Sequence, residues 1–126
     1  MVTQQGPADM DQNPDPRIVR LAELEIDPAQ LAAYAALLRA EIEASVRTEP
    51  GVLALYATCL VDNPAAIRLT ELYANQAAYE AHLLSPHFLK YKQQTAEMVL
   101  SLRLIAVQPL LLAAKTLQQP TAGAGL

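Results

Sequence analysis

Hydrophobic and polar positions first form a clear pattern at Arg17. From there to residue 26, apolar residues occur on both parities, as in a strand whose sheet is covered on both faces. Asp27-Pro28 then predicts the start of a helix, because Asp is a good N-cap and Pro suits the first helical position. Apolar residues follow at helical spacing for about five turns, until Glu49-Pro50-Gly51 ends the helix. The predicted apolar stripe is Leu31, Tyr34, Ala35, Leu38, Ile42 and Val46, and the charged residues placed away from it are Arg39, Glu41, Glu43 and Arg47.

The next two apolar stretches predict a β-hairpin. Residues 52–61 and 67–74 are both short and lie on either side of the turn cluster Asp62-Asn63-Pro64. In the second strand, Glu71 and Tyr73 are two residues apart, so their side chains point to the same face of the sheet.

Two short helices and a last strand complete the pattern. Asn75 is expected to cap a helix that runs to about residue 84, and Ser85-Pro86 is a strong signal for the start of another helix. Residues 101–107 alternate again as a strand, and Pro109 ends it. Beyond this point, residues 110–117 are compatible with either a short helix or an extended arm.

The order β-α-β-β-α-β predicts a ferredoxin-like α+β fold, with one four-stranded antiparallel sheet and helices on one face. Residues 17–109 form this single domain, residues 1–16 are a polar, disordered lead, and residues 110–126 are a C-terminal arm and tail. The sheet face without helices would expose Val, Leu and Tyr side chains. An apolar surface of that size indicates an interface, and a second copy of the chain is the simplest partner.

Composition supports the homodimer and argues against two other kinds of partner. Charged residues make up only 17% of the chain, below the ~25% of an ordinary domain. The net charge is −4 and there is no run of Lys or Arg, which argues against nucleic acid. No apolar run reaches the ~20 residues that cross a bilayer, and residues 1–12 lack the features of a secretory signal. We therefore expect a cytoplasmic protein.

The sequence lacks the common cofactor and metal motifs. Its four glycines are too sparse for a glycine-rich nucleotide fingerprint or a phosphate-binding loop. Cys59, the only cysteine, is expected to be a buried thiol, and the spacing of His82 and His87 is not a recognised ligand spacing. We therefore predict no metal and no cofactor.

Candidate chemistry concentrates between Glu71 and Phe88, which include both histidines. Each histidine is either a structural hydrogen-bonding group or a catalytic one, since imidazole titrates near neutral pH. Glu71 either points to solvent at a sheet edge or lies in a pocket as a base with a raised pKa. Tyr73 and the earlier Tyr56 are core aromatics unless they face the same cavity as Glu71 and His82. We expect Glu71, Tyr73, His82 and His87 to converge on a cavity between the sheet and the helices.

These residues carry a resemblance to a known family. The motifs are Glu49-Pro50-Gly51 followed by Tyr56, then Glu71-x-Tyr73, Tyr79-x-x-His82 and Ser85-Pro86-His87-Phe88. In this order they resemble the antibiotic biosynthesis monooxygenase superfamily, and its quinol-monooxygenase-like branch most of all. The resemblance extends from about residue 17 to residue 109 and implies a dimeric ferredoxin-like α+β barrel.

The resemblance further implies oxygenation of a small phenol or quinol without flavin, haem or metal. In that reading His82 or His87 is the base, Glu71 orients it, Tyr56 and Tyr73 bind substrate oxygens, and Phe88 helps to exclude water. Haem-degrading relatives use a tryptophan, which this chain lacks. A branch that isomerises a phosphorylated signalling sugar ranks second, because the cations available for phosphate are not clustered. A non-catalytic dimeric ligand-binding module is the third alternative.

Overall fold

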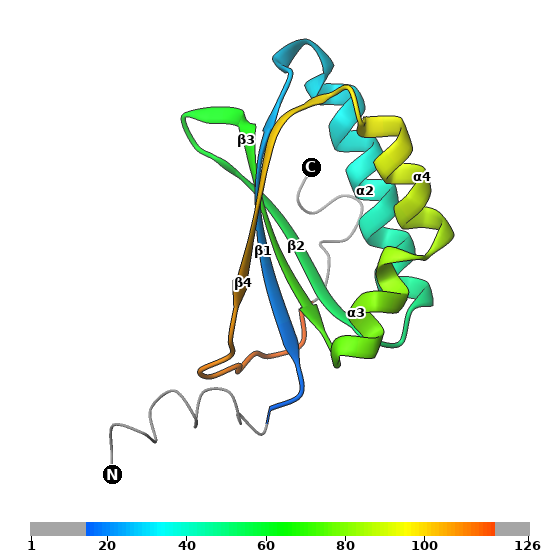
Figure 1. Cartoon of the computed structure of the whole chain (residues 1–126). Coiled ribbons are helices and arrows are strands. Elements are labelled where there is room, and N and C mark those ends of the chain that lie inside the picture. Colours follow the sequence, from blue (N-terminus) through cyan, green and yellow to red (C-terminus); the bar gives the residue numbers. More distant parts are fainter. Residues whose placement is uncertain (1–14, 118–126) are drawn as a thin grey trace.

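The computed structural model describes residues 15–117 as a single antiparallel sheet with all helices on one face (Figure 1). The strand order in the sheet is β2-β3-β1-β4, and every neighbouring pair is antiparallel. This confirms the predicted ferredoxin-like α+β fold. In chain order the elements are β1 (Ile18–Ile26), the 3-10 helix η1 (Pro28–Gln30), α2 (Leu31–Thr48), β2 (Val52–Leu60), β3 (Asn63–Tyr73), α3 (Gln76–Leu83), α4 (Pro86–Thr95) and β4 (Val99–Val107).

The predicted capping residues start the helices. Asp27 accepts a hydrogen bond from the backbone N–H of Ala29, and the first turn is the 3-10 helix η1 before α2 begins at Leu31. The side chain of Asn75 caps α3 by accepting from the N–H of Ala78 at 2.8 Å. Two strands begin earlier than predicted. The hairpin turn is confined to the residues between Leu60 and Asn63, so β3 starts at once, and β4 starts two residues before Ser101.

The core lies between the sheet and α2. Ala22, Leu24 and Ile26 point inward from β1 and pack with Tyr34 and Leu38 of α2. The hydroxyl groups of Tyr34 and Tyr91 are 2.6 Å apart, which joins α2 to α4 inside this apolar layer. The core thereby holds the two longest helices at a fixed position over the sheet.

The outer sheet face carries charges as well as the predicted apolar residues. Glu23 lies 3.9 Å from Arg68 and 3.6 Å from Arg103, and Arg68 also lies 3.6 Å from Glu25. Leu21 pairs with Thr70 and Ile105 on the same face. The expectation for Cys59 is wrong, since this residue is exposed in the chain on its own. It lies one residue before the end of β2, next to the turn of the hairpin.

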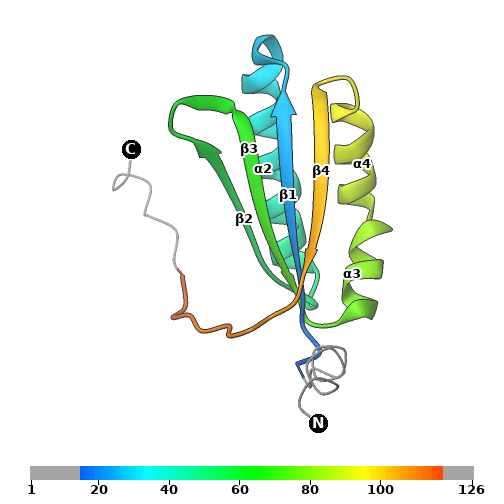
Figure 2. The same cartoon turned by 60° about the vertical axis from the view of Figure 1, so that its left-hand side comes forward.

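The segment after β4 runs away from the sheet (Figure 2). Residues 111–117 belong to neither helix nor strand, as in the arm alternative, and Leu110 and Leu111 are 90% and 83% exposed. At the other end, Arg17 contacts Asp15 at 2.7 Å. The remainder of the predicted lead and tail, residues 1–14 and 118–126, lies outside the described residues. Among the described helices, none has the length and apolar character needed to span a membrane.

Candidate functional site

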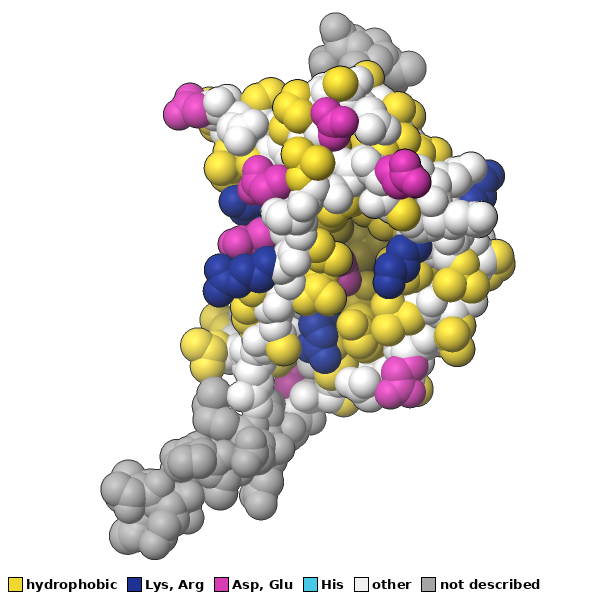
Figure 3. Space-filling model, turned by 45° about the horizontal axis from the view of Figure 1, so that its top comes forward, with side chains coloured by type: hydrophobic (Ala, Val, Ile, Leu, Met, Phe, Trp, Pro, Cys, Tyr) yellow, Lys and Arg dark blue, Asp and Glu magenta, His cyan; other side chains and the backbone are white. Residues whose placement is uncertain are grey.

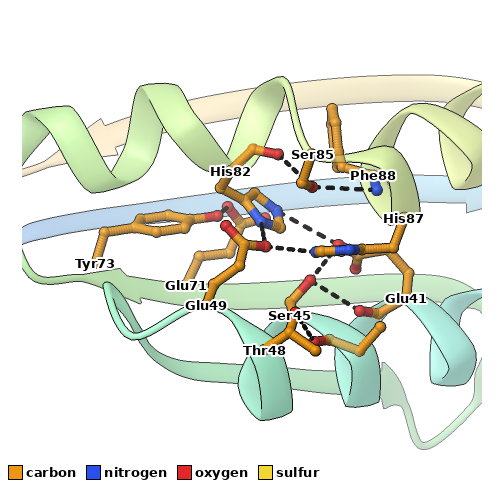
Figure 4. A network of polar contacts seen from close by, with 11 residues as sticks. Glu41, Ser45, Thr48, Glu49, Glu71, Tyr73, His82, Ser85, His87 and Phe88 are labelled. Carbon is orange, nitrogen blue, oxygen red and sulfur yellow. Dashed lines mark hydrogen bonds and ion pairs between the residues drawn. The ribbon is translucent and has the colours of Figure 1, made fainter.

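Both histidines contact one oxygen of Glu49 (Figure 4). Glu49 is the C-cap of α2, His82 lies in the last turn of α3 and His87 in the first turn of α4. The Nδ1 atom of His82 is 2.9 Å from Glu49 Oε2, and the Nε2 atom of His87 is 2.5 Å from the same oxygen. Partial burial would raise the pKa of Glu49, but hydrogen bonds from the two imidazoles outweigh it and lower this pKa. Glu49 is therefore a carboxylate at neutral pH.

A close packing contact places α3 beside the end of α2. A Cβ atom on Gly51 would lie 2.4 Å from the Cβ of Ala78, so only glycine at residue 51 allows α3 to pack this closely. The N–H of Ala74 also donates to the carbonyl of Gly51 at 2.8 Å. The turn that ends α2 thus determines where His82 lies relative to Glu49.

Ser85 fixes the break between α3 and α4. Its hydroxyl donates to the carbonyl oxygen of His82 at 2.7 Å and accepts from the N–H of Phe88 at 3.3 Å. The Phe88 ring then packs against His82, with centroids 5.0 Å apart. One buried serine therefore sets the relative position of the two histidine-bearing turns.

A second carboxylate lies on the other side of the His82 ring. Glu41 is 7% exposed, and its Oε1 atom is 3.4 Å from Nε2 of His82. The hydroxyl of Ser45 lies 2.8 Å from the same Glu41 oxygen. Burial raises the pKa of Glu41, while Ser45 and the nearby imidazoles act in the opposite direction. His82 is thus placed between an ionised carboxylate and one that burial makes easier to protonate.

Glu71 and Tyr73 share the inner sheet face, as predicted. The Tyr73 hydroxyl donates to Oε1 of Glu71 at 2.7 Å. Burial raises the pKa of Glu71, and Tyr73, His82 and Arg20 reduce the effect. Burial also raises the pKa of Tyr73, so its hydroxyl stays protonated. Arg20 is the cross-strand partner of Glu71, and its guanidinium lies over the Tyr79 ring, 4.8 Å from the centroid.

These groups surround a small cavity between the sheet and the helices. Its volume is about 30 Å³, room for one or two water molecules. Its lining includes two carboxyl groups and one imidazole, those of Glu41, Glu71 and His82. The complete lining is Leu38, Glu41, Ile42, Leu55, Tyr56, Leu69, Glu71, His82, Phe88 and Tyr91.

A larger groove of about 200 Å³ lies between α2 and α4. Glu41 and Tyr91 line both the groove and the inner cavity, so the two spaces are neighbours separated by these side chains. The other lining residues are Leu37, Ala40, Ala44, His87, Lys90 and Gln94. Figure 3 shows a hollow in the surface, with hydrophobic side chains lining it and an acidic side chain visible inside it.

The structure brings together most of the residues that the sequence singled out. Glu71, His82 and Phe88 line the cavity, and Tyr73 reaches it through its hydrogen bond to Glu71. His87 lies behind His82, bonded to Glu49, with the ring centroids 6.3 Å apart.

Tyr56 borders the cavity but is less well placed than Tyr73. It is 44% exposed and pairs with Thr70, whereas its neighbour Leu55 pairs with Glu71. Paired residues share a sheet face and successive residues alternate, so the Tyr56 side chain points to the outer face.

Two site residues escaped the sequence analysis. The sequence pattern predicts that Glu41 lies away from the apolar stripe of α2, and this prediction is wrong. The buried residues of that helix are Tyr34, Leu38, Glu41 and Ser45. These residues are spaced by four, three and four positions and so lie on one face of the helix. This spacing was the signal in the sequence that Glu41 is buried. Glu49 is part of the predicted helix stop and of a motif that carries the family resemblance, but the sequence assigns it no role in the site.

The site is also a set of potential ligands for a cation. Within the part of the chain that the structure describes, the potential ligand atoms of Glu49, His82 and His87 lie within 4.8 Å of one another. Glu41 and Glu71 add two further carboxylates nearby, and Arg20 is the cross-strand partner of Glu71.

Comparison with solved structures identifies several similar chains. A candidate antibiotic biosynthesis monooxygenase from Bacteroides thetaiotaomicron is 46% identical, with a TM-score of 0.76 over 79% of this chain and 95% of that one. A protein from Mycobacterium tuberculosis is 27% identical, with a TM-score of 0.70 over 78% of this chain and 99% of that one. A candidate monooxygenase from Lactobacillus acidophilus is 29% identical, with a TM-score of 0.72 over 73% of this chain and 44% of that one.

A search of curated proteins finds no significant match. The family model described as antibiotic biosynthesis monooxygenase matches residues 17–94, which is more than half of the chain. Those residues include β1 through most of α4 and every side chain of the cluster around His82. The chain therefore belongs to the antibiotic biosynthesis monooxygenase family.

Proposed function

We propose that the protein is a monooxygenase that oxidises a small phenol or quinol with dioxygen and needs no resident cofactor. The observation that carries this proposal is the orientation of His82. Glu49 accepts a hydrogen bond from the Nδ1 atom of His82, which leaves Nε2 of that ring on the side of Glu41 and the inner cavity. A carboxylate that holds Nδ1–H in place makes Nε2 the basic nitrogen of a neutral imidazole.

The chemistry begins with proton transfer from a phenolic hydroxyl to Nε2 of His82. The resulting ring anion is electron-rich and is oxidised by dioxygen, which forms a carbon–oxygen bond and a peroxide at the ring. Loss of water from the peroxide then gives a quinone. One oxygen atom of dioxygen stays on the ring and the other leaves as water, so a quinol C₆H₆O₂ becomes a hydroxyquinone C₆H₄O₃. The substrate and dioxygen supply all the electrons.

The surrounding residues have supporting roles. Phe88, Leu38 and Leu69 keep the space apolar, which strengthens electrostatic interactions with the anion. Glu71, with its raised pKa and the Tyr73 hydroxyl beside it, is placed to donate or share a hydrogen bond with a substrate oxygen. Because the inner cavity is far smaller than the ~300 Å³ of an ordinary ligand pocket, we propose that the ring enters from the groove by displacing Tyr91.

A phosphorylated sugar is a poorer fit. The phosphate would face Glu41, Glu49 and Glu71, and anionic groups repel one another strongly in a partly buried site. Arg20 is already placed over the Tyr79 ring beside Glu71.

Oxygen consumption with a panel of hydroquinones and phenols tests the proposal, using full-length protein treated with a chelator. The informative variant is His82→Asn, because the amide nitrogen replaces Nδ1–H toward Glu49 while Nε2 is lost. We expect it to reduce turnover at least 100-fold, within the range ascribed to general bases, in a variant that circular dichroism shows to be folded at the assay temperature. Glu80→Gln on the exposed side of α3 is the matched control and should retain full activity.

Two results would reject the monooxygenase proposal. One is saturable binding of these aromatics with no oxygen uptake by the wild-type protein, which would indicate a binding module. The other is unchanged turnover in His82→Asn, which would exclude His82 as the base.

A further inference from the structure

We propose that Glu49, His82 and His87 bind a divalent transition-metal ion, with Zn²⁺ as the representative ion. The site uses Oε2 of Glu49, Nδ1 of His82 and Nε2 of His87, which converge within 4.8 Å. Two imidazoles and one carboxylate are the donor set of many zinc sites and of open transition-metal sites. Binding at these atoms is a property separate from the monooxygenase activity proposed above.

The distances between the ligand atoms are close to those of a metal site. With metal–ligand bonds of ~2.0–2.2 Å and a tetrahedral arrangement, ligand atoms lie roughly 3.3 Å apart. The present separations from Glu49 are 2.9 Å to His82 and 2.5 Å to His87. An ion therefore needs the carboxylate to withdraw by less than about 1 Å. The two histidine nitrogens lie within 4.8 Å of each other, so the imidazoles also need to approach by up to about 1.5 Å. Three protein ligands leave a fourth position for water.

Glu41 provides the supporting contact that such sites usually have. A metal-bound histidine donates its other N–H to a carboxylate or carbonyl, which fixes the ring and its tautomer. Here Oε1 of Glu41 lies 3.4 Å from Nε2 of His82, and Ser45 holds that same oxygen at 2.8 Å. On metal binding Nδ1 gives up its proton and Nε2–H faces Glu41. The second carboxylate and its own hydrogen bond are therefore already in place.

The ligands are accessible from the surface and carry a favourable charge. The side chains of His87 and Glu49 are 19% and 16% exposed, and His87 lines the groove between α2 and α4. An ion reaches the site through this groove without disturbing the core. Glu41 and Glu49 lie on either side of His82, so two carboxylates offset the charge of a divalent cation.

Metal binding has a consequence for the proposed reaction, and this part rests on the proposed function. An ion on Nδ1 places the remaining ring proton on Nε2, which is the nitrogen proposed to accept the phenolic proton. Zn²⁺ is therefore expected to inhibit oxygen uptake, and a chelator to restore it. The ion acts here as a regulator of the base.

Binding is tested first and without any turnover. Chelator-treated full-length protein is titrated with Zn²⁺ by calorimetry and with Co²⁺ by visible spectroscopy, where the ligand-field bands report coordination by nitrogen. We expect one equivalent to bind with micromolar or tighter affinity. His87→Ala should weaken binding at least 100-fold, and Glu41→Gln should weaken it about 10–100-fold as a supporting residue. Glu80→Gln, an exposed carboxylate on α3, should bind as the wild type does.

Circular dichroism and thermal melts establish that each variant is folded, and His87→Gln replaces His87→Ala if the latter is not. The inference is overturned if the wild type binds neither ion at one equivalent, or if the His87 variant binds as tightly as the control. Weak binding of several equivalents that Glu80→Gln also reduces would likewise overturn it.

The inhibition is measured separately, which keeps the two proposals distinguishable. One-equivalent binding in a protein that consumes no oxygen would retain the metal site and reject the monooxygenase. Oxygen uptake that Zn²⁺ does not change, in a protein shown to bind it at this site, would reject the regulatory consequence alone.

Discussion

Glu49→Gln is the most informative single substitution, because one oxygen of Glu49 accepts hydrogen bonds from both histidines. The change removes the negative charge and keeps the length and shape of the side chain. The glutamine oxygen retains acceptor capacity, while its amide group has only donors to offer the imidazoles. We expect the relative positions of α2, α3 and α4 to loosen as a result.

The expected loss of stability follows from the two contacts. Hydrogen bonds to charged groups contribute ~1.5–3 kcal/mol each, and those between neutral groups ~0.5–1.5 kcal/mol. Reducing two contacts from the first class to the second costs about 2–3 kcal/mol. The Glu49 side chain is 16% exposed, so solvent screens it only modestly. For a chain of this size that loss lowers the melting temperature by roughly 8–12 °C.

Urea unfolding of chelator-treated protein measures this value, at one fixed protein concentration because association changes apparent stability. Glu43→Gln is the control on the same helix. The contact of Glu43 with Arg39 is 3.7 Å long and lies at the surface. Its loss should therefore lower the free energy of unfolding by less than about 0.5 kcal/mol. A Glu49→Gln variant as stable as Glu43→Gln would show that the contacts with the histidines contribute nothing to folding, and the reasoning would fail.

Three further predictions concern pH, assembly and packing. Burial raises the folded-state pKa of Glu71 above its usual 4.5, so the stability gained from its protonated form is lost as pH rises from about 4.5 through the folded value. Urea melts across that pH range should therefore show that the stability of Glu71→Gln relative to the wild type increases as pH rises. Parallel pH profiles of the two proteins would contradict this. Sedimentation at micromolar concentration should show a dimer of two 13.6 kDa chains. Leu21→Lys on the outer sheet face should dissociate or unfold this dimer, whereas Leu89→Lys at an exposed position of α4 should not. A wild-type monomer would refute the dimer. Gly51→Ala should lower the melting temperature and weaken the effect of Zn²⁺, because its Cβ meets Ala78 at 2.4 Å, and an unchanged melt would show that α3 can move aside.

Local signals in the sequence were enough to predict the fold and one half of the site. Asn75 and Ser85 are caps whose geometry depends only on neighbouring residues, and both caps form as expected. They define the break between α3 and α4 on which the histidines lie. The pair Glu71 and Tyr73 follows from strand periodicity alone, and the hydrogen bond between them confirms a shared face.

The other half of the site depends on contacts between distant segments. Glu49 is 33 residues from His82 and 38 from His87, and nothing local to a helix stop indicates such partners. Glu41 looked like a surface residue because a charged side chain inside an apolar stripe is normally costly to bury. Its burial is compensated by Ser45, one turn later on the same helix, and by His82 from another helix. The exposure of Cys59 likewise has no local signal, because the burial of a strand residue depends on which distant segments cover it.

The position of one proton on His82 distinguishes the two proposed uses of the site. As a base, the ring needs its proton on Nδ1, facing Glu49 at 2.9 Å. As a metal ligand, it needs that proton on Nε2, facing Glu41 at 3.4 Å. The shorter contact to Glu49, whose pKa is lowered, favours the first tautomer in the metal-free chain. Nitrogen NMR of the imidazoles should therefore show His82 protonated at Nδ1 without metal and at Nε2 after one equivalent of Zn²⁺. If the ring is already protonated at Nε2 alone in the metal-free protein, Nε2 cannot act as the base, and the role proposed for Glu49 in orienting His82 is wrong.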